Sequence, residues 1–453
     1  MYDVVIIGGG PGGYVAAIRL SQLGKKVALI EKENLGGTCT NKGCIPTKAM
    51  LAAAHLYTEI NSKAKKFGIS VENVSYDLTS IMKHTNKSIT MSRKGIEFLM
   101  KKNKIDVFKG TGIIEDKNHV RIKETDETIE GKYLILAHGS TPTIFSPFDK
   151  VEGIWTSDDV FKMKKLPEDI LVIGGGVIGV EFSTFFSSLG KKVILVELEE
   201  HILPFEDNDV AEVIRKSLVK KGVQVLEKTK VTDIKKENER YKVIVQNEKE
   251  LIELSVEKIL LAVGRKPNIP EDVRKLGVEI KRGVVTDNKM RTNIENVYAI
   301  GDVRGQIMLA HVAMFEGIVA AHNIAGEEKV MDYNAVPSII FSNPEVASTG
   351  LKEKDVDPEK VIIGKFPVSA NGRARTMEER EGFVKVIAEK GTGKIVGISI
   401  VSPSATDMIM EGVIAVKHGL TIEELASAIH PHPTLTETIL GAIETAEGMG
   451  IHI

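Results

Sequence analysis

The sequence predicts an α/β protein in which one strand–turn–helix–strand unit occurs twice. Residues 3–33 read DVVIIGGGPGGYVAAIRLSQLGKKVALIEKE, and residues 169–199 read DILVIGGGVIGVEFSTFFSSLGKKVILVELE, at a constant offset of 166 positions. Each copy opens with an apolar run as long as a buried strand, followed by a glycine-rich turn, a helix-like segment and a second apolar run. Such near-continuous apolar strands beside helices are typical of parallel sheets that helices cover on both faces.

The composition sets outer limits on the function. The chain has 453 residues, enough for roughly two to four domains. Its 60 basic and 62 acidic residues almost balance, which gives no indication of a nucleic-acid or anionic membrane partner. No apolar run approaches the ~18 residues that a spanning helix needs. The first residues, MYDVVIIGGG, resemble a strand more than an export signal, so we expect a cytoplasmic protein.

The spacing of the glycines predicts two dinucleotide-binding sites. Both turns follow the pattern G-x-G-x-x-G, with Gly8, Gly10 and Gly13 in the first copy and Gly174, Gly176 and Gly179 in the second. This pattern allows a tight turn, close approach of a pyrophosphate and close helix–strand packing. An acid that can accept hydrogen bonds from a ribose follows 23 positions after each first glycine, as Glu31 and Glu197. Two complete copies therefore predict FAD and a nicotinamide nucleotide as ligands.

A third apolar segment, NVYAIGDV at 296–303, predicts another buried strand. We expect this strand to end at Asp302 and to present its carboxylate to a ligand hydroxyl. The alternative is that Asp302 only caps the following segment.

Both cysteines of the chain, Cys39 and Cys44, lie in the stretch GGTCTNKGCIPTK at 36–48. Residues five apart in a regular helix are too far separated for a disulfide, so a bridge requires an irregular segment. The neighbouring glycines allow such irregularity, and Pro46 suits the first turn of a helix. A redox-active disulfide is favoured over a structural one in the cytosol. A zinc site is disfavoured because no compact Cys/His cluster completes four ligands, and two unrelated free thiols remain the alternative.

The stretch HPHPTLTE at 430–437 carries two possible roles. Thr434 and Glu437 fit the S/T-x-x-E capping box that starts a helix. His430 and His432 are then ordinary loop residues, or one of them is an acid/base whose orientation Glu437 fixes.

Several motifs together resemble the flavin-dependent disulfide oxidoreductases, the class I pyridine nucleotide-disulfide oxidoreductase family. They are LGGTCTNKGCIPTKA, VIGGGVIGVE, LLAVGRKPN, YAIGD, MLAH and HPHPTLTE, and they extend over essentially the whole chain. The resemblance implies two Rossmann-like domains and a C-terminal α+β dimerisation domain. The FAD-binding domain is expected at 1–142 and 265–333, the NAD-binding domain at 143–264, and the interface domain at 334–453.

Within the family, the branch that oxidises dihydrolipoamide fits best. The resemblance then implies a homodimer with active sites shared between chains, and a lipoyl-bearing protein of a 2-oxoacid dehydrogenase or glycine cleavage complex as partner. The partner subunit's His432, oriented by Glu437, would take a proton from dihydrolipoamide. Cys39 would be the sulfur that the substrate attacks, and Cys44 the sulfur nearer the flavin. Electrons would pass through tightly bound FAD and reduce NAD⁺ to NADH.

The resemblance also assigns the cofactor contacts. Lys48 would lie near the flavin and pair with Glu181, since a buried charge there needs a partner. The implied FAD contacts are Gly8, Gly10, Gly13, Glu31, Lys32, Gly37, Thr38, Lys48, Gly112, Gly139, Ser140, Asp302, Met308, Leu309, Ala310 and His311. The implied NAD contacts are Gly174, Gly176, Val177, Ile178, Gly179, Glu181, Glu197, Val231 and Gly264. No metal is expected.

The sequence departs from the family pattern at four positions. His138 stands where a threonine is usual, and Lys42 where an apolar residue is common. Ser402 and Asp407 replace a common glycine and glutamate. The first two lie near the flavin or the cysteines, so they bear on redox potential and substrate affinity while leaving the reaction class intact.

Three alternatives stay open to test. Glutathione reductases share the fold but use NADPH and need basic residues after the second fingerprint, where this chain reads VELEEH. In NADP⁺ a 2′-phosphate would meet Glu197, with Glu199 and Glu200 adding negative charge nearby. Mercuric reductases carry extra C-terminal cysteines, and this C-terminus, ETAEGMGIHI, has none. A purely structural subunit of a multienzyme complex is disfavoured by the cysteine pair and the His432–Glu437 motif.

Overall fold

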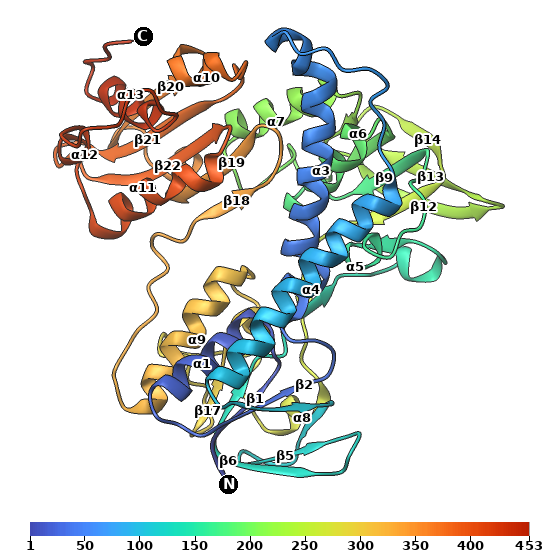
Figure 1. Ribbon diagram of the computed structural model, residues 1–453, viewed down its shortest axis with the longest axis vertical. Helices are drawn as coiled ribbons and strands as arrows, with labels where there is room; N and C mark the ends of the chain where they lie inside the picture. The colour runs from blue at the N-terminus through green and yellow to red at the C-terminus, as the bar shows by residue number, and fades with distance from the viewer. Residues whose placement is uncertain (453) are drawn as a thin grey trace.

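The computed structural model describes residues 1–452 and contains three units (Figure 1). The N-terminal unit, which holds the first glycine turn, lies at one end of the long axis. The second unit, which holds the second glycine turn, and the C-terminal unit lie side by side at the other end. The long helices α3 (Cys44–Lys63) and α4 (Leu78–Lys102) run between the N-terminal unit and the second unit. Among the short helices are α5 (Ser157–Val160), α8 (Glu271–Lys275), α10 (Gly372–Thr376) and α12 (Ile422–Ala426).

The N-terminal unit is built on a seven-stranded sheet. Its strands are β1 (Tyr2–Ile7), β2 (Val27–Glu31), β3 (Asp106–Lys109), β4 (Gly112–Ile114), β5 (His119–Ile122), β6 (Thr128–Leu136) and β17 (Val297–Ala299). The parallel part has the order β3-β2-β1-β6-β17, while β5 and β4 extend the first half of β6 in antiparallel pairing. Helices α1 (Pro11–Gln22) and α9 (Ala310–Ala325) pack on each other and on this sheet.

One predicted strand ends earlier than expected. The segment 296–303 does return to the first sheet, but β17 ends at Ala299, and Asp302 lies in a 3₁₀ turn over Gly301–Arg304. Gly301 has a φ of +71°, so the chain turns out of the strand there. The carboxylate is therefore presented by the turn, not by the last residue of a strand.

The second copy forms a five-stranded parallel sheet of the order β11-β10-β9-β15-β8. These strands are β8 (Trp155–Thr156), β9 (Asp169–Ile173), β10 (Lys192–Val196), β11 (Gln224–Leu226) and β15 (Lys258–Leu261). Helices α6 (Val177–Ser188) and α7 (Asn208–Lys220) pack on one face. An antiparallel sheet of β12 (Lys230–Glu237), β13 (Arg240–Gln246) and β14 (Leu251–Val256) packs on the other. The central strand order β2-β1-β6 of the first copy thus recurs as β10-β9-β15.

The chain crosses between the two copies through a two-stranded ribbon. Strand β7 (Ser140–Pro142) leads out of the first unit, β16 (Arg265–Pro267) leads back, and the two pair antiparallel. These crossings lie beside the predicted domain bounds at 142 and 265, and the division of the chain into domains stays a prediction.

The C-terminal unit is a five-stranded antiparallel sheet of the order β18-β19-β22-β21-β20. The strands are β18 (Ser338–Ile340), β19 (Glu345–Gly350), β20 (Val361–Pro367), β21 (Phe383–Glu389) and β22 (Ile395–Ser402). Helices α11 (Ala405–His418) and α13 (Glu437–Ala446) pack on it and close its core.

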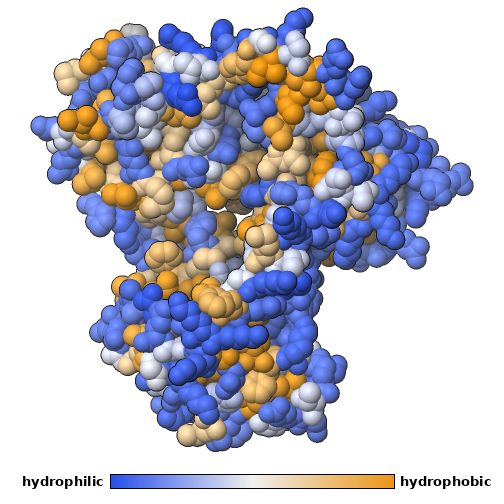
Figure 2. All heavy atoms as spheres, in the orientation of Figure 1, coloured by the Kyte–Doolittle hydropathy of each residue, from blue (hydrophilic) through white to orange (hydrophobic). Residues whose placement is uncertain are grey.

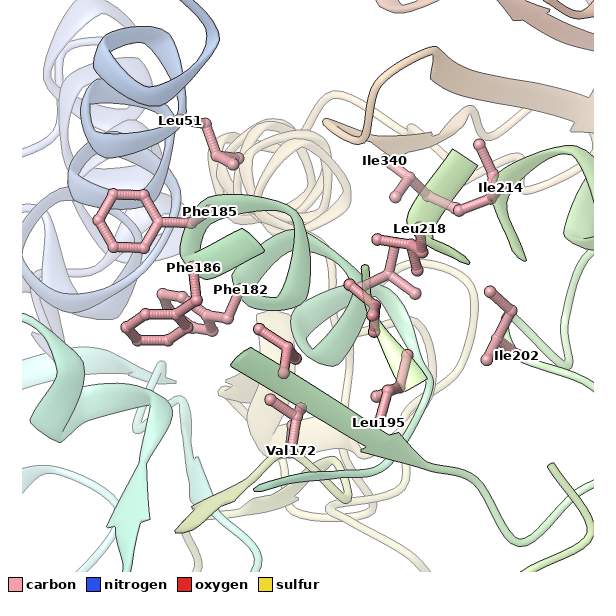
Figure 3. Close-up of a cluster of buried hydrophobic side chains, with 14 of the residues drawn as sticks. Leu51, Val172, Phe182, Phe185, Phe186, Leu195, Ile202, Ile214, Leu218 and Ile340 are labelled. Atoms are coloured by element: carbon pink, nitrogen blue, oxygen red, sulfur yellow. The ribbon is translucent and has the colours of Figure 1, made fainter. Parts of the chain in front are cut away.

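The largest apolar core joins all three units. Leu51 on α3 packs with Phe182, Phe185 and Phe186 on α6, and the same cluster continues to Ile340 at the edge of the C-terminal sheet (Figure 3). Burying an aromatic or leucine side chain contributes about 1.5–3 kcal/mol. This core therefore fixes the helix that begins at Cys44 against the helix of the second glycine turn.

A buried ionic cluster also joins the second unit to the C-terminal unit. The ammonium of Lys385, a side chain only 1% exposed, lies 2.9 Å from Asp207, 2.9 Å from Asp209 and 2.8 Å from Glu353. The three carboxylates are close enough together to hold a metal ion, but Lys385 already lies among them. The cluster therefore fastens the start of α7 to the C-terminal sheet.

We predict that Lys385→Ala destabilises the protein by about 3–5 kcal/mol, because it removes the counter-charge of the buried Asp207 carboxylate, whereas Asp209 keeps its ion pair with Lys365. Differential scanning calorimetry should show a fall of several degrees in the unfolding midpoint. Lys242→Ala is the matched control, since Lys242 makes an exposed ion pair with Glu253 at 3.0 Å. Equal midpoints for the two variants would contradict the proposed fastening role.

Candidate active site

One continuous cleft of about 1720 Å³ runs between the three units. Its lining includes both glycine turns, the cysteine loop and the start of α9. Figure 2 shows the surface hollowed between the N-terminal unit and the two units above it. Two extended ligands could thus approach each other in the same cleft.

The two glycine turns have the same geometry. Gly8 and Gly174 have φ values of +107° and +101°, which favour glycine strongly over other residues. A Cβ on Gly13 would lie 1.9 Å from the carbonyl oxygen of Gly8, and a Cβ on Gly179 would lie 1.9 Å from that of Gly174. The third glycine of each turn therefore lets the helix pack directly on the turn, so that its N-terminus faces the cleft.

The distal acids make identical contacts in the two copies. Glu31 accepts hydrogen bonds from the backbone N–H of Gly9 (2.7 Å) and of Glu33 (2.7 Å). Glu197 accepts from Gly175 (2.6 Å) and Glu199 (2.8 Å), the positions 166 residues further on. Each carboxylate is thereby fixed at the end of the second strand, with lone pairs left for ribose hydroxyls.

One neighbouring charge differs from the expectation. Glu200 pairs with Lys228 at 2.5 Å, so it adds less negative charge near Glu197 than the sequence predicts. Lys230 also lines the cleft. Glu197 and Glu199 remain the acids that a ribose 2′-phosphate would meet.

The cysteine loop is irregular where the sequence requires it. Helix α2 (Gly37–Lys42) ends before Gly43, whose φ and ψ are −149° and −107°, and α3 begins at Cys44. A Cβ on Gly37 would lie 2.7 Å from the Cα of Gly10, so the loop packs directly against the first glycine turn. Neither cysteine forms a disulfide in the structure, and both are partly buried.

The two thiols have very different acidities. A hydrogen bond from Cys39 lowers the pKa of Cys44 to about 7, and the charge of Lys48 acts in the same direction. The same hydrogen bond, together with burial, raises the pKa of Cys39. The reduced pair therefore carries its negative charge on Cys44 at the first residue of α3, where the helix dipole also favours it.

Lys48 and Glu181 lie together between α3 and α6. The ammonium of Lys48 is 2.9 Å from the carboxylate of Glu181, whose side chain is 5% exposed. Glu181 also accepts the backbone N–H of Phe341 at 3.1 Å, and Lys48 lies over the Phe341 ring. Sequence reasoning missed Phe341, because an isolated phenylalanine carries no recognisable signal.

A polar network connects the ribbon to the cleft. Ser140 donates to Asp302 (2.5 Å), and the guanidinium of Arg265 donates to the hydroxyl and the carbonyl of Ser140 at 2.9 Å each. Arg265 also lies near Asp158 of the second unit. Sequence reasoning did not single out Arg265, although it stands in the motif LLAVGRKPN.

The two histidines of the 430–437 stretch have different environments. His430 is 6% exposed, and its ring nitrogens contact Glu411 (2.9 Å) and the Ala428 carbonyl (2.9 Å). His432 is 79% exposed, and only its Nδ1 is engaged, 2.8 Å from Glu437. His430 is thus a structural residue, whereas His432 presents a free nitrogen to the surface.

The predicted capping box is only half formed. Glu437 accepts the N–H of Thr434 at 2.8 Å, but the hydroxyl of Thr434 bonds to Pro431, and α13 begins only at Glu437. Burial acts to raise the pKa of Glu437, but hydrogen bonds from Thr434 and His432 outweigh it and lower that pKa. The charged carboxylate of Glu437 therefore holds both the loop and the His432 ring in place.

All but three of the predicted site residues line the cleft. Gly179 packs beneath the second turn, and His432 and Glu437 lie in the C-terminal unit, away from the cysteines of the same chain. Of the departures from the family pattern, Lys42 pairs with Glu33 at 2.6 Å and His138 lines the cleft. The roles assigned to these residues stay predictions.

The comparisons with known proteins agree with this geometry. A family model described as pyridine nucleotide-disulphide oxidoreductase matches residues 2–317, and the dimerisation domain of the same family matches residues 336–443. This chain belongs to the pyridine nucleotide-disulphide oxidoreductase family. The predicted family and fold class are confirmed, and the dimerisation domain supports a homodimer.

Curated relatives and solved structures match over the full length. A dihydrolipoyl dehydrogenase of Bacillus subtilis is 39% identical over 459 residues, covering 100% of this chain and 97% of its own. One from Geobacillus stearothermophilus is 38% identical over 458 residues, with the same coverage. The structure of LpdA from Mycobacterium tuberculosis has a TM-score of 0.90 at 26% identity, covering 98% of this chain and 99% of its own. The flavoprotein disulfide reductase RclA from Escherichia coli has a TM-score of 0.86 at 27% identity, with the same coverage.

Family membership confirms FAD and NAD as the cofactors of an oxidoreductase. The residues present fit both, because two equivalent glycine turns, each with a fixed distal acid, open into the same cleft. Among residues 1–452, no helix is long and apolar enough to cross a membrane.

We predict that NAD⁺ is used about 100-fold more efficiently than NADP⁺, since like charges brought together cost several kcal/mol. Glu197→Gln should reduce this ratio of kcat/KM values and weaken NAD⁺ use. Glu31→Gln, the equivalent change in the first copy, should leave the ratio unaltered. Steady-state assays with both nucleotides test this, and comparable efficiencies for the unmodified protein would refute it.

We also predict a pH-dependent charge-transfer band in the two-electron-reduced holoprotein. The Cys44 thiolate is present above its pKa and lost below it, so the long-wavelength absorbance should rise with pH around a midpoint of about 7. Cys44→Ser should remove the band. An unchanged band in that variant would show that the sulfur is wrongly assigned.

Proposed function

We propose that this chain is a dihydrolipoyl dehydrogenase, which oxidises dihydrolipoamide carried on a lipoyl protein and reduces NAD⁺ to NADH. The observation that carries the proposal is the exposed imidazole of His432, oriented through Nδ1 by Glu437. Full-length similarity to curated dihydrolipoyl dehydrogenases supports the choice of substrate.

His432 is suited to act as a base toward a thiol. With Nδ1–H donated to the Glu437 carboxylate, the tautomer leaves a lone pair on Nε2. In a homodimer formed through residues 334–453, the partner subunit's His432 would complete the cysteine site of the facing chain. The charge on Glu437 would stabilise the imidazolium that forms when the proton is taken up.

The thiol chemistry begins from the Cys39–Cys44 disulfide. The partner subunit's His432 removes a proton from one substrate thiol, and the thiolate attacks Sγ of Cys39. A substrate–Cys39 bond forms while the Cys39–Cys44 bond breaks, and Cys44 leaves as a thiolate. The second substrate thiol attacks the substrate sulfur bound to Cys39 and gives its proton to the leaving Cys39 sulfur, while the first proton stays on His432. Oxidised lipoamide then leaves.

The chain's own residues favour charge on the inner sulfur. Cys44 receives the hydrogen bond of Cys39 and the field of Lys48, so it is the better leaving group. Glu181 holds Lys48 beside it. When bound at the first glycine turn, FAD would supply the two-electron chemistry that connects the Cys39–Cys44 pair with NAD⁺.

In this proposal each of the three units has its own role. Residues 1–142 and 265–333 bind FAD, residues 143–264 bind NAD, and residues 334–453 form the dimer and supply His432. The partner is the lipoyl protein of a 2-oxoacid dehydrogenase or glycine cleavage complex, in the cytoplasm.

We predict that His432→Ala separates the two half-reactions. Loss of a positioned base should lower dihydrolipoamide oxidation by on the order of 10²–10⁴-fold. Hydride exchange involves no such proton removal, so NADH should still reduce an artificial acceptor through the FAD-loaded variant. Both activities are measured on folded holoprotein. His418→Ala, at an exposed histidine that ends α11, is the control and should retain both.

Mixed dimers test whether the site is shared. A Cys39→Ser chain paired with a His432→Ala chain should regain dihydrolipoamide oxidation, because one complete site forms in each heterodimer. The proposal fails if His432→Ala keeps near-full activity, or if verified heterodimers stay inactive.

A further inference from the structure

Helix α4 presents a row of unpaired positive charge to solvent. Its sequence contains six lysines and arginines and a single acid, Glu97. Four of the lysines fall within about 40° of one line along the helix, because each residue turns it by about 100°. These four are Lys83, Lys87, Lys94 and Lys101. All four are exposed, and no Asp or Glu oxygen among residues 1–452 lies within 4.0 Å of their ammonium nitrogens.

This arrangement of charge does not serve the helix itself. Lys83 and Lys87 are one turn apart, and like charges at that spacing destabilise a helix. On α7, by contrast, Arg215 and Lys216 both pair with Glu212, at 2.7 and 3.3 Å. The lysines of α4 are therefore free to meet a partner that carries the opposite charge.

Two large apolar side chains lie among these lysines. Met91 and Phe98 are each 64% exposed. Along the helix the order is Lys87, Met91, Lys94, Phe98 and Lys101, at spacings of 4, 3, 4 and 3, so each is the surface neighbour of the next. Methionine and aromatic residues are enriched in protein–protein interfaces. The four lysines with Met91 and Phe98, which we call the α4 surface, therefore suit an acidic protein.

The α4 surface lies beside the cysteine loop. Helix α4 packs against α2, which holds Cys39, and against α3, which begins at Cys44. It crosses the front of the molecule in Figure 1, and the same strip of Figure 2 is mostly hydrophilic. The diameter of a helix is about 10–12 Å. An extended dihydrolipoyl-lysine arm is longer than this, so a carrier seated on α4 can bring its dithiol to the cysteines.

We propose that the α4 surface docks an acidic protein that carries the dithiol substrate on a lipoyl-lysine arm. This inference rests on the proposed function, because it takes the substrate to arrive on a lipoyl protein. Complementary charge speeds the encounter and strengthens the complex, whereas free dihydrolipoamide has no acidic surface to be attracted. Thiol exchange at Cys39 involves none of the residues of the α4 surface.

The test compares the KM values of two synthetic peptides and of free dihydrolipoamide. Both peptides carry a central dihydrolipoyl-lysine, flanked in one by alternating aspartate and leucine and in the other by alternating asparagine and leucine. Changing the four lysines of the α4 surface to glutamine should raise the KM of the aspartate peptide about 10-fold at low salt, because each exposed charge pair contributes a factor of about two. The value of kcat should stay the same, and the effect should fade at high salt.

Three comparisons separate docking from other effects. The four-glutamine variant should keep the KM of the unmodified protein for the asparagine peptide and for dihydrolipoamide, which also shows that it is folded. Phe98→Ser should raise the KM of both peptides but not that of dihydrolipoamide. The matched control changes four exposed lysines of other segments that also lack an ion pair, and it should behave like the unmodified protein. Its changes to glutamine are at Lys123, Lys249, Lys275 and Lys329.

Failure of the docking proposal and failure of the proposed function give different results. If the unmodified protein does not oxidise dihydrolipoamide, the proposed function is wrong and the docking proposal falls with it. If it does, an unchanged KM of the aspartate peptide in the four-glutamine variant overturns the docking proposal alone. An equal rise in the matched control would also overturn it, by showing that only net charge matters. So would an unchanged KM together with lost binding to phosphatidylglycerol vesicles, which would assign the lysines to a membrane surface.

Discussion

Helix α3 begins at Cys44 and packs Leu51 against the phenylalanines of α6, the helix that starts at the second glycine turn. This contact fixes the cysteine loop relative to the second glycine turn. The buried Glu181 needs a counter-charge, and Lys48 supplies it one turn into α3. Apolar packing brings the helices together, and the ion pair then fixes the register that puts Cys44 at the meeting point of two dinucleotide sites.

The two copies of the strand–turn–helix–strand repeat differ at a few side chains. The glycine geometry and the hydrogen bonds of Glu31 and Glu197 are equal in the two copies, because the tight turn and helix contact require them. The first copy adds the cysteine loop, which packs against Gly10 through Gly37. It also carries His138 where the second has Val263. What is shared lies where the backbone must approach a phosphate, and the copies differ in the cysteine loop and at the position of His138.

The two cysteine thiols differ in acidity, and this difference separates their proposed roles. Cys44 sits at a helix start beside Lys48 and is the more acidic, while Cys39 donates to it and holds its own proton. The base proposed for the substrate lies on another unit, where Glu437 fixes it without burying it. Because this base lies on the C-terminal unit, the C-terminal sheet and the Lys385 cluster that joins it to α7 are part of the site's support.

The sequence by itself determined the doubled α/β unit, since strand-length apolar runs and glycine spacing are local consequences of backbone sterics. Through recognisable motifs it also predicted residues on every main part of the cleft and the Lys48–Glu181 pair. It expected the strand at 296–303 to end at Asp302, but β17 ends at Ala299 and the chain turns at Gly301, where φ is positive. The capping box, one of the two roles left open for the 430–437 stretch, is only half formed because Thr434 donates to Pro431. Only the tertiary structure separated buried His430 from exposed His432, paired Glu200 with Lys228, and showed Phe341 and Arg265 at the cleft. These outcomes depend on which distant side chains meet, and burial and hydrogen-bond partners of that kind are not encoded in any local pattern.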